Sequence, residues 1–289
     1  MHRSLVFLSV LLLFALVGSA RAASPWTPVD TGLDYGVFTP VDEPDSSIRI
    51  AIVRIDPTYY DFSLHTVSEE GGPALSLDEW ASRHELAVLI NASMYLPDVR
   101  SSTGYMRNGD HLNNPRIGTK LGSFFVAGPD STSLPRADLL DRTVDPWETI
   151  ISHYRVVVQN YRLVSNGRRI LWAPGGPLYS IAAIGQDAAG SILFIHCREP
   201  ITAYDFANIL LGLPINIHDV AYVEGGPQAG LMLRTPATYQ AWAGRHRVDF
   251  WSSGNPKAPL PNVIGVRRRA LPDGTGLFPR PGDRPLAQP

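Results

Sequence analysis

The pattern of hydrophobic and polar positions predicts a chain built mainly of short β-strands. In residues 62–67, Phe62 and Leu64 alternate with polar neighbours, as in a half-buried strand, and we expect the apolar run at 48–55 to pair with it antiparallel. Residues 87–90 are apolar on both faces, which is typical of a central strand. Further strands are predicted at residues 122–127, 155–158, 181–184, 192–197, 220–223, 231–233 and 263–266.

Two helices are predicted from the capping signals at their N-termini. Ser76 and Glu79 form a capping box that opens a helix to about Leu86, and Thr202 with Asp205 opens a second helix. Strands therefore outnumber helices, and no linker or internal repeat divides the chain. We expect an α+β fold in a single domain, with a mixed, largely antiparallel β-sheet core, a few packed helices and long loops.

The first residues have the features of a secretory signal peptide. His2 and Arg3 precede an apolar run at residues 5–17, and the Ala-Arg-Ala sequence that ends at Ala22 matches a signal-peptidase site. The run is shorter than the ~20 residues that span a bilayer, which leaves an uncleaved anchor as the weaker alternative. We expect residues 1–22 to be removed and the mature protein to be periplasmic or secreted, without a membrane span.

The composition changes again near the C-terminal end. Residues 270–289 hold five prolines, three glycines and few apolar side chains, so they cannot bury enough surface to fold. We predict a disordered Pro/Gly-rich tail there. The folded domain is expected to occupy residues 23–269, a length compatible with one large domain.

Charge and cysteine content narrow the classes of partner. The 289 residues include 25 Lys and Arg against 27 Asp and Glu, a formal net charge of -2. Loss of Arg3 and Arg21 with the signal peptide leaves 23 against 27, or -4. This balance predicts no nucleic-acid partner, because such binding needs a basic surplus. Cys197 is the only cysteine, which excludes an internal disulfide.

Familiar catalytic and cofactor motifs are absent from the sequence. It contains no G-x-S-x-G, no Walker loop, no H-E-x-x-H and no paired C-x-x-C. His196 and Cys197 cannot form a dyad, since neighbours on a strand point to opposite faces, and His218 with Asp219 is typical of a turn. We predict no cofactor. A Ca²⁺ ion held by oxygens at loop ends stays open, because such a site needs no fixed spacing.

Three predicted strands each end at a polar residue that a turn follows at once. These residues are Asn91, Arg198 and Glu224. Loops beyond strand ends commonly form the ligand crevice of a sheet, so the three side chains could converge on one pocket; the alternative is that they only punctuate turns. Arg198 favours a pocket, because it lies just before the helix N-terminus at Thr202, where an anion such as phosphate is stabilised.

Glu224 is the first candidate for a catalytic carboxylate. It ends an apolar strand, where partial burial raises the pKa of a carboxyl toward the range of a general acid or base. Gly225 and Gly226 follow and allow a ligand to approach the backbone closely. The alternative is a structural carboxylate tied to neighbouring backbone N–H groups.

Four blocks of the sequence resemble the phosphodiester glycosidases. Residues 91–95 are similar to the family's Asn-Ala-Gly-aromatic turn, 121–125 to its Gly/Phe strand, 181–187 to its Thr-Ala-Ile-Gly-x-Asp block, and 222–226 to its Leu-Asp-Gly-Gly-Gly-Ser block. Their order and spacing agree with the family over about half of the chain. The resemblance implies a hydrolase that cleaves the bond between a sugar's anomeric carbon and a phosphodiester.

The chain departs from the family pattern at three places. Glu224 stands where the family has Asp, Pro227 and Gln228 replace Gly-Ser, and Tyr179 lies where an Arg commonly precedes the Ala-Ile-Gly block. The sequence resembles a bacterial branch of the family. Since these departures touch the presumed site, a non-catalytic envelope protein that binds a glycan or phosphoglycan is the alternative function.

The resemblance and the residue chemistry together assign roles in the candidate site. Arg198 holds the phosphate, Glu224 gives or takes a proton, and Asp187 is the candidate second carboxylate. Tyr95 and Tyr105 could stack on the sugar ring or belong to the core. The residues predicted to bind substrate are Asn91, Tyr95, Tyr105, Gln159, Thr202, Gly225 and Gly226.

Overall fold

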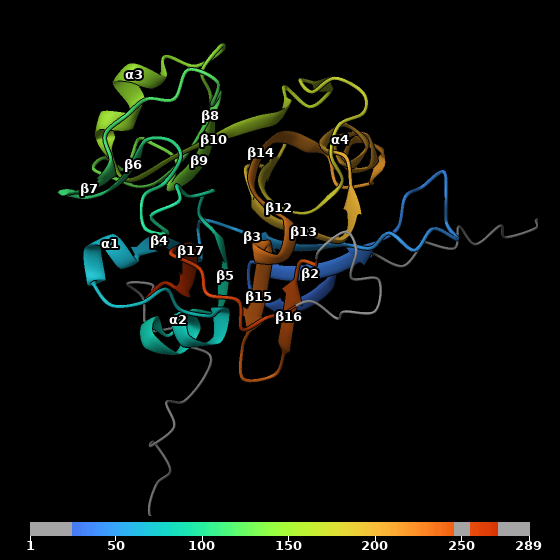
Figure 1. Ribbon diagram of the computed structural model, residues 1–289, viewed down its shortest axis with the longest axis horizontal. Coiled ribbons are helices and arrows are strands. Elements are labelled where there is room, and N and C mark those ends of the chain that lie inside the picture. Colours follow the sequence, from blue (N-terminus) through green and yellow to red (C-terminus); the bar gives the residue numbers. More distant parts are fainter. Residues whose placement is uncertain (1–24, 246–254, 271–289) are drawn as a thin grey trace, which may run out of the picture.

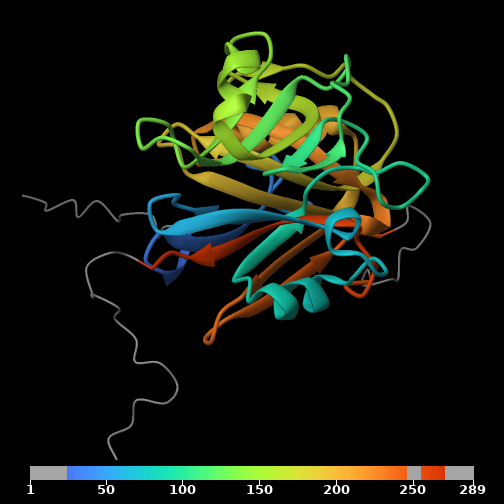
Figure 2. The same ribbon diagram turned by 90° about the vertical axis from the view of Figure 1, so that its left-hand side faces the viewer.

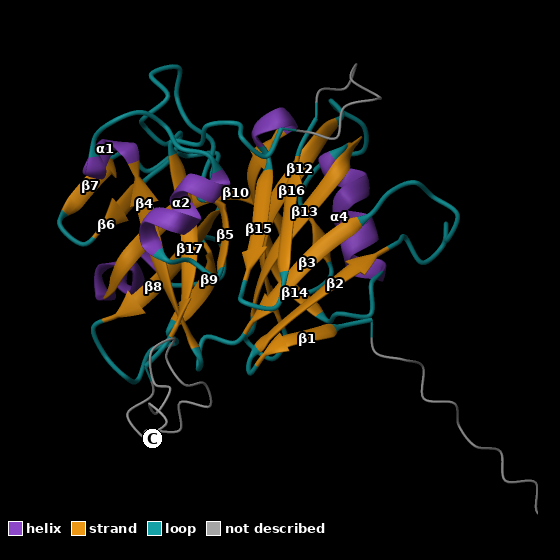
Figure 3. Cartoon of the chain, turned by 90° about the horizontal axis from the view of Figure 1, so that it is seen from below, coloured by secondary structure: helices purple, strands orange, loops and turns teal. Residues whose placement is uncertain are grey.

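A computed structural model of the chain describes residues 25–245 and 255–270, and its strands form two sheets in one body. The predicted signal peptide, and all of the predicted tail except Ala270, lie outside the described residues. All pairings between described strands are antiparallel, and helices are few and short (Figures 1 and 3). The predicted largely antiparallel α+β fold is confirmed.

The first sheet has twelve strands. Its main path follows the order β1 (Thr27–Asp30), β2 (Leu33–Phe38), β3 (Ile50–Ile55), β13 (Ile192–Ile201), β12 (Tyr179–Asp187), β14 (Ile217–Gly225), β10 (Tyr154–Ser165), β6 (Met106–Asn108) and β7 (His111–Asn114). Three strands lie off this path: β8 (Ser123–Pro129) and β11 (Arg169–Ile170) pair with β10, and β9 (Ala137–Asp141) pairs with β8.

The second sheet has five strands and faces the first. Its order is β16 (Tyr239–Ala243), β15 (Gly230–Arg234), β5 (Val88–Asn91), β17 (Asn262–Arg268) and β4 (Tyr60–Thr66). Strand β5 is buried along its whole length and lies at the centre, as its apolar faces predict. Figure 2 shows the two sheets as layers, with helix α2 on the outer side of the second.

Helices close the ends and outer faces of the sheets. They are α1 (Val67–Glu70), α2 (Leu77–His84), α3 (Trp147–Ile150) and α4 (Ala203–Gly212), with 3-10 turns η1 (Ile151–His153) and η2 (Gly226–Gln228). The Ser76 capping box and the Thr202 cap are both present, as predicted. Helix α2 ends before Leu86, because Glu85 adopts the left-handed conformation with φ 52°. Among described residues, none of the helices combines the length and apolar character needed to cross a bilayer.

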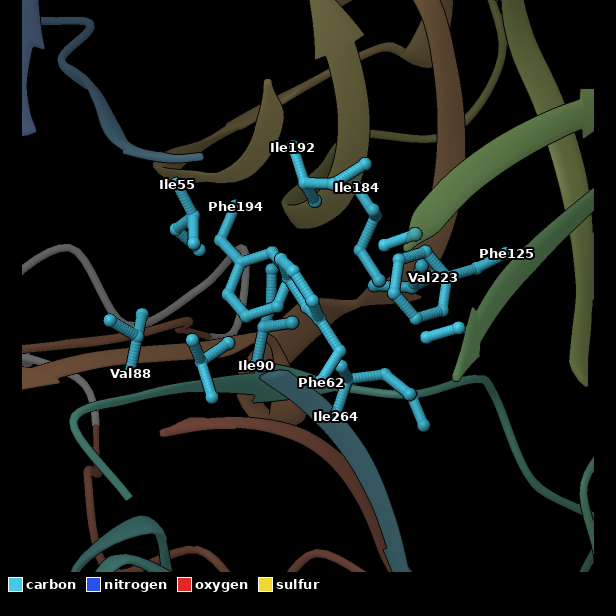
Figure 4. Packing of buried hydrophobic residues seen from close by; sticks show 14 of the residues in the cluster. Ile55, Phe62, Val88, Ile90, Phe125, Ile184, Ile192, Phe194, Val223 and Ile264 are labelled. Carbon is cyan, nitrogen blue, oxygen red and sulfur yellow. The ribbon is translucent and has the colours of Figure 1, made fainter. Parts of the chain in front are cut away.

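The main hydrophobic core fills the space between the two sheets. Phe62 and Ile90 from the second sheet meet Phe194, Ile184 and Val223 from the first, and the Phe62 and Phe194 rings lie edge to face, 6.1 Å apart (Figure 4). Smaller cores lie under α4, α2 and α3. Burial of this extent accounts for a stable fold without a disulfide.

The predicted pairing between residues 48–55 and 62–67 is wrong. Strand β3 pairs with β2 and β13 in the first sheet, whereas β4 pairs with β17 in the second. The turn between them therefore passes the chain from one sheet to the other. Both strands carry the apolar residues of a sheet interior, and that local pattern does not specify the partner.

Candidate active site

Glu224 lies at the end of β14, beside an irregularity in the sheet. Ala182 pairs with Glu224 and Ala183 with Tyr222, so Val223 is an extra residue that bulges from the ladder. Bulges re-aim neighbouring side chains. Glu224 is 7% exposed; its Oε1 accepts a hydrogen bond from the Gly225 N–H at 2.9 Å, while Oε2 is buried with no partner among the described residues. Burial raises the pKa of Glu224 to about 7.

The backbone after Glu224 is fixed by two buried side chains. Asn91, from the second sheet, donates from Nδ2 to the Gln228 carbonyl at 3.0 Å and accepts from the Gly230 N–H at 2.7 Å. His196, from β13, contacts the Ala229 carbonyl with Nε2 at 3.2 Å. Burial lowers the pKa of His196 to about 4, so it stays neutral at pH 7. These residues position the turn, and each amide atom of Asn91 makes one hydrogen bond to it.

A tyrosine hydroxyl approaches Gly225 closely. A Cβ atom at position 225 would lie 2.0 Å from the Tyr222 hydroxyl, well inside van der Waals contact. Gly226 follows with φ 76°, a conformation that favours glycine. The Tyr222 hydroxyl is therefore held against the backbone next to Glu224.

Three tyrosines share the surroundings of Glu224. Burial, followed by the negative charge of Glu224, raises the pKa of both Tyr95 and Tyr222, so both phenols stay protonated at neutral pH. The third is Tyr179, whose Cβ would lie 3.5 Å from a Cβ at Gly225. Tyr95 was predicted at the site, whereas Tyr179 and Tyr222 were not assigned a role. Tyr222 belongs to the 222–226 block and Tyr179 lies just before the 181–187 block, and these positions are the only signal in the sequence for a role at the site.

Arg198 lies on β13, two strands from Glu224. Alternation along β13 puts Arg198 on the same face as His196, whose pKa its charge helps to lower. Ala182 pairs with both His196 and Glu224, so β12 separates the two strands and their backbones are about 10 Å apart. The Ser180 hydroxyl of β12 donates to the Arg198 carbonyl at 2.5 Å.

An ion pair that was not predicted from the sequence borders Arg198. The Arg245 guanidinium pairs with Glu199, and the Arg245 backbone N–H donates to the Ser180 hydroxyl at 3.0 Å. Arg245 is 9% exposed and follows β16 of the second sheet. Both sheets thus contribute to this edge of the molecule.

Two predicted substrate-binding residues are engaged elsewhere. Gln159 is fully buried, and its amide makes four hydrogen bonds of 2.8–3.2 Å, all to the backbone of Tyr105, Gly118 and Leu121. Tyr105 packs against the core beneath α3. The Gln159 amide is therefore saturated and fixes the backbone at Tyr105, Gly118 and Leu121.

Asp187 lies far from Glu224, and Thr202 is engaged in capping α4. Asp187 ends β12 at the opposite end, five residues from Ala182 or roughly 16 Å along the strand. Its Oδ1 accepts from the Ala189 and Ser191 N–H groups at 2.9 Å, as in a turn. Thr202 caps α4 and donates to the Asp205 carboxylate at 2.6 Å, so a negative side chain already occupies that N-terminus.

Comparison with known proteins identifies the family. The sequence model described as phosphodiester glycosidase matches residues 84–267, more than half of the chain. The chain belongs to the phosphodiester glycosidase family. The matched region of this phosphodiester glycosidase contains Asn91, Arg198 and Glu224 and the strands β5, β13 and β14 that carry them. A search among curated protein sequences gave no match.

Solved structures support the same fold at low sequence identity. The catalytic domain of zebrafish N-acetylglucosamine-1-phosphodiester alpha-N-acetylglucosaminidase, auto-inhibited by its pro-peptide, is 12% identical with a TM-score of 0.60, covering 82% of this chain and 84% of its own. A Synechocystis protein is 11% identical with a TM-score of 0.53, covering 82% of this chain and 62% of its own. A Burkholderia pseudomallei protein provisionally named as exported is 10% identical with a TM-score of 0.50, covering 76% and 74%.

Proposed function

We propose that this chain is an exported hydrolase that cleaves the glycosidic bond of a sugar-1-phosphodiester. Family membership supports the reaction class. The observation that carries the proposal is Glu224, a buried carboxyl with a pKa of about 7 and one oxygen that has no partner within residues 25–245 and 255–270. Such a group changes protonation state near neutral pH, as proton transfer in catalysis requires.

Glu224 acts as the base that activates water. The leaving group is a phosphate monoester, which departs with the electron pair of the broken C–O bond and needs no proton from the enzyme. A water molecule attacks the anomeric carbon while Glu224 Oε2 takes its proton, and the products are the free sugar and the phosphomonoester. One carboxylate therefore suffices, and the distant Asp187 has no part in the reaction.

Arg198 and Tyr95 bind the two parts of the substrate. The guanidinium of Arg198 neutralises the phosphodiester from a strand whose backbone lies about 10 Å from that of Glu224. Tyr95 supplies an apolar surface for the sugar ring. Asn91 acts as a positioning residue through the turn after Glu224.

Substitution of Glu224 tests the catalytic role. Against a panel of sugar-1-phosphodiesters, we expect Glu224→Gln to lower kcat by about 10²–10⁴-fold, because it removes a proton acceptor of the same size. Asp187→Asn is the matched control, a buried carboxylate at the far end of the sheet, and should leave kcat unchanged. Equal activity of Glu224→Gln and the unaltered chain would contradict the assignment.

The same panel separates the enzyme from a glycan-binding protein. Binding of sugar-1-phosphodiesters without turnover by the unaltered chain would favour the non-catalytic alternative. Export is tested independently, since we propose cleavage after Ala22. The N-terminal sequence of the exported protein should then begin at Ala23 and its domain should extend over residues 23–269.

A further inference from the structure

A cluster of three metal-ligating side chains lies outside the Glu224 site. It consists of His65 at the end of β4, Glu70 at the end of α1 and His84 at the end of α2. One ligand atom from each lies within 4.8 Å of the others. His65 Nδ1 is 3.3 Å from Glu70 Oε1, and His84 Nε2 is 3.0 Å from the same oxygen.

We propose that His65, Glu70 and His84 form a binding site for a divalent transition-metal ion of the zinc class. Zinc bonds to nitrogen and oxygen are about 2.0–2.2 Å long, so tetrahedral ligand atoms stand roughly 3.3 Å apart. The two measured separations from Glu70 Oε1 are close to this value. Two imidazoles and one carboxylate form a known zinc ligand set, in which water takes the fourth position.

The surroundings orient the ligand atoms. The Ser63 hydroxyl lies 2.9 Å from His65 Nε2, which directs Nδ1 toward Glu70, as an outer hydrogen bond does for a metal-bound histidine. Arg83 Nη1 lies 3.7 Å from Glu70 Oε2, and His84 Nε2 lies 3.1 Å from the same oxygen, so both Glu70 oxygens are within reach of His84. His65 is 8% exposed, so its ring is held by packing.

One ring must move when the ion binds. The His65 and His84 rings are stacked, with centroids 3.8 Å apart and planes 25° apart, whereas an ion has to lie in the plane of each imidazole. His84 is the last residue of α2 and the more exposed of the two, so its ring turns out of the stack. The Trp80 and His84 rings are stacked with their centroids 5.7 Å apart, so this movement changes the surroundings of Trp80.

The cluster opens on a cavity that gives an ion access. The cavity has a volume of about 820 Å³ and is lined by His65, Glu70 and His84 together with Glu69, Asn108 and Arg267. Because this site and the Glu224 site share no residue, the proposal stands or falls independently of the proposed hydrolase activity.

Calorimetric titration with Zn²⁺ tests the site. The mature chain, made without a histidine tag and stripped with chelator, should bind one equivalent, and Co²⁺ should give the visible absorption of a tetrahedral ion. We expect Glu70→Gln and His84→Ala each to weaken binding by at least about tenfold, and Ser63→Ala by about tenfold. Circular dichroism checks that the variants are folded, and both positions lie at helix ends.

A matched histidine provides the control. His153 also pairs with one carboxylate, Asp130, at 3.1 Å, but no second histidine is near that pair in the described structure. His153→Ala should bind Zn²⁺ as the unaltered chain does. Absence of one-equivalent binding, or equal binding by a folded His84→Ala variant, would overturn the proposal.

Discussion

Two carboxylates of this protein, Asp141 and Glu224, show opposite pKa shifts at nearly equal solvent exposure. Asp141 is 5% exposed and Glu224 is 7% exposed. Asp141 accepts hydrogen bonds from Ser165, Thr143 and Arg162. Burial raises its pKa, but these hydrogen bonds outweigh burial and the net pKa is lowered. Glu224 has one backbone donor, and its pKa is raised to about 7.

The contrast teaches that burial alone does not identify a functional carboxylate. What differs is the number of donors around the charged form, which decides whether the group is fixed as an anion or can change its protonation state near pH 7. Asp141 stabilises the fold, whereas Glu224 is available for proton transfer. The predictions below change one carboxylate or its neighbours at a time.

The largest effect is expected on removing the charge of Asp141. In Asp141→Asn the Arg162 guanidinium loses its buried partner, so we expect the free energy of unfolding to fall by about 3 kcal/mol. Urea denaturation measures this. Asp34→Asn is the control, because the Asp34–Arg54 pair is more exposed and should contribute less than about 1 kcal/mol. Equal losses in the two variants would contradict the contrast.

Removing the charge of Glu224 should instead raise the free energy of unfolding at alkaline pH. The folded-state pKa is raised, so the protonated form is favoured on folding and stability falls as pH rises from 4.5 to about 7. Glu224→Gln should therefore be more stable than the unaltered chain at pH 8.5, by on the order of 1–3 kcal/mol, with no difference below pH 4.5. A variant less stable at pH 8.5 would show that Glu224 is satisfied as an anion.

The pH dependence of hydrolysis should follow the same group. As a base, Glu224 acts when deprotonated, so kcat should rise with pH up to about 7 and then level off. At pH 6 the rate should be about tenfold below the plateau. An inflection near 4.5 would mean that substrate or water supplies the missing donors. The profile is measured with a substrate whose own phosphate does not titrate in this range.

The smallest effect is expected at the tyrosines. Tyr95→Leu removes a phenol whose pKa is raised by burial and then by the Glu224 charge, so KM should increase by about three- to tenfold with little change in kcat. Tyr105→Leu changes the same side chain in the core beneath α3 and should leave KM unaltered. A similar change of KM in both variants would point to a general loss of rigidity.

Local signals in the sequence predicted elements better than long-range partners. The Ser76 capping box and the apolar strand at residues 87–90 depend on neighbouring residues and were predicted correctly. The partner of β4 was not, because pairing depends on a strand about two hundred residues away. The turn signal after Asn91 in the sequence also does not indicate that Asn91, in one sheet, reaches the loop after Glu224 in the other.

Within the candidate site, the sequence predicts which residue types are present but not whether their polar atoms already have hydrogen-bond partners. Glu224 was chosen for its place at the end of an apolar strand, and the structure gives it the raised pKa that this position predicts. Gln159 was chosen for its amide, yet the backbone at residues 105–121 occupies every atom of it. Such saturation depends on loops that fold back over a strand, which a linear pattern does not contain.

The two hydrogen bonds between Asn91 and the turn after Glu224 affect the order of events during folding. Glu224 belongs to one sheet, and the turn behind it is held by a side chain of the other. The geometry that the proposed hydrolysis needs therefore does not exist in either sheet alone. Activity should appear only at the final docking of the two layers, so a newly made chain stays inert until it is complete.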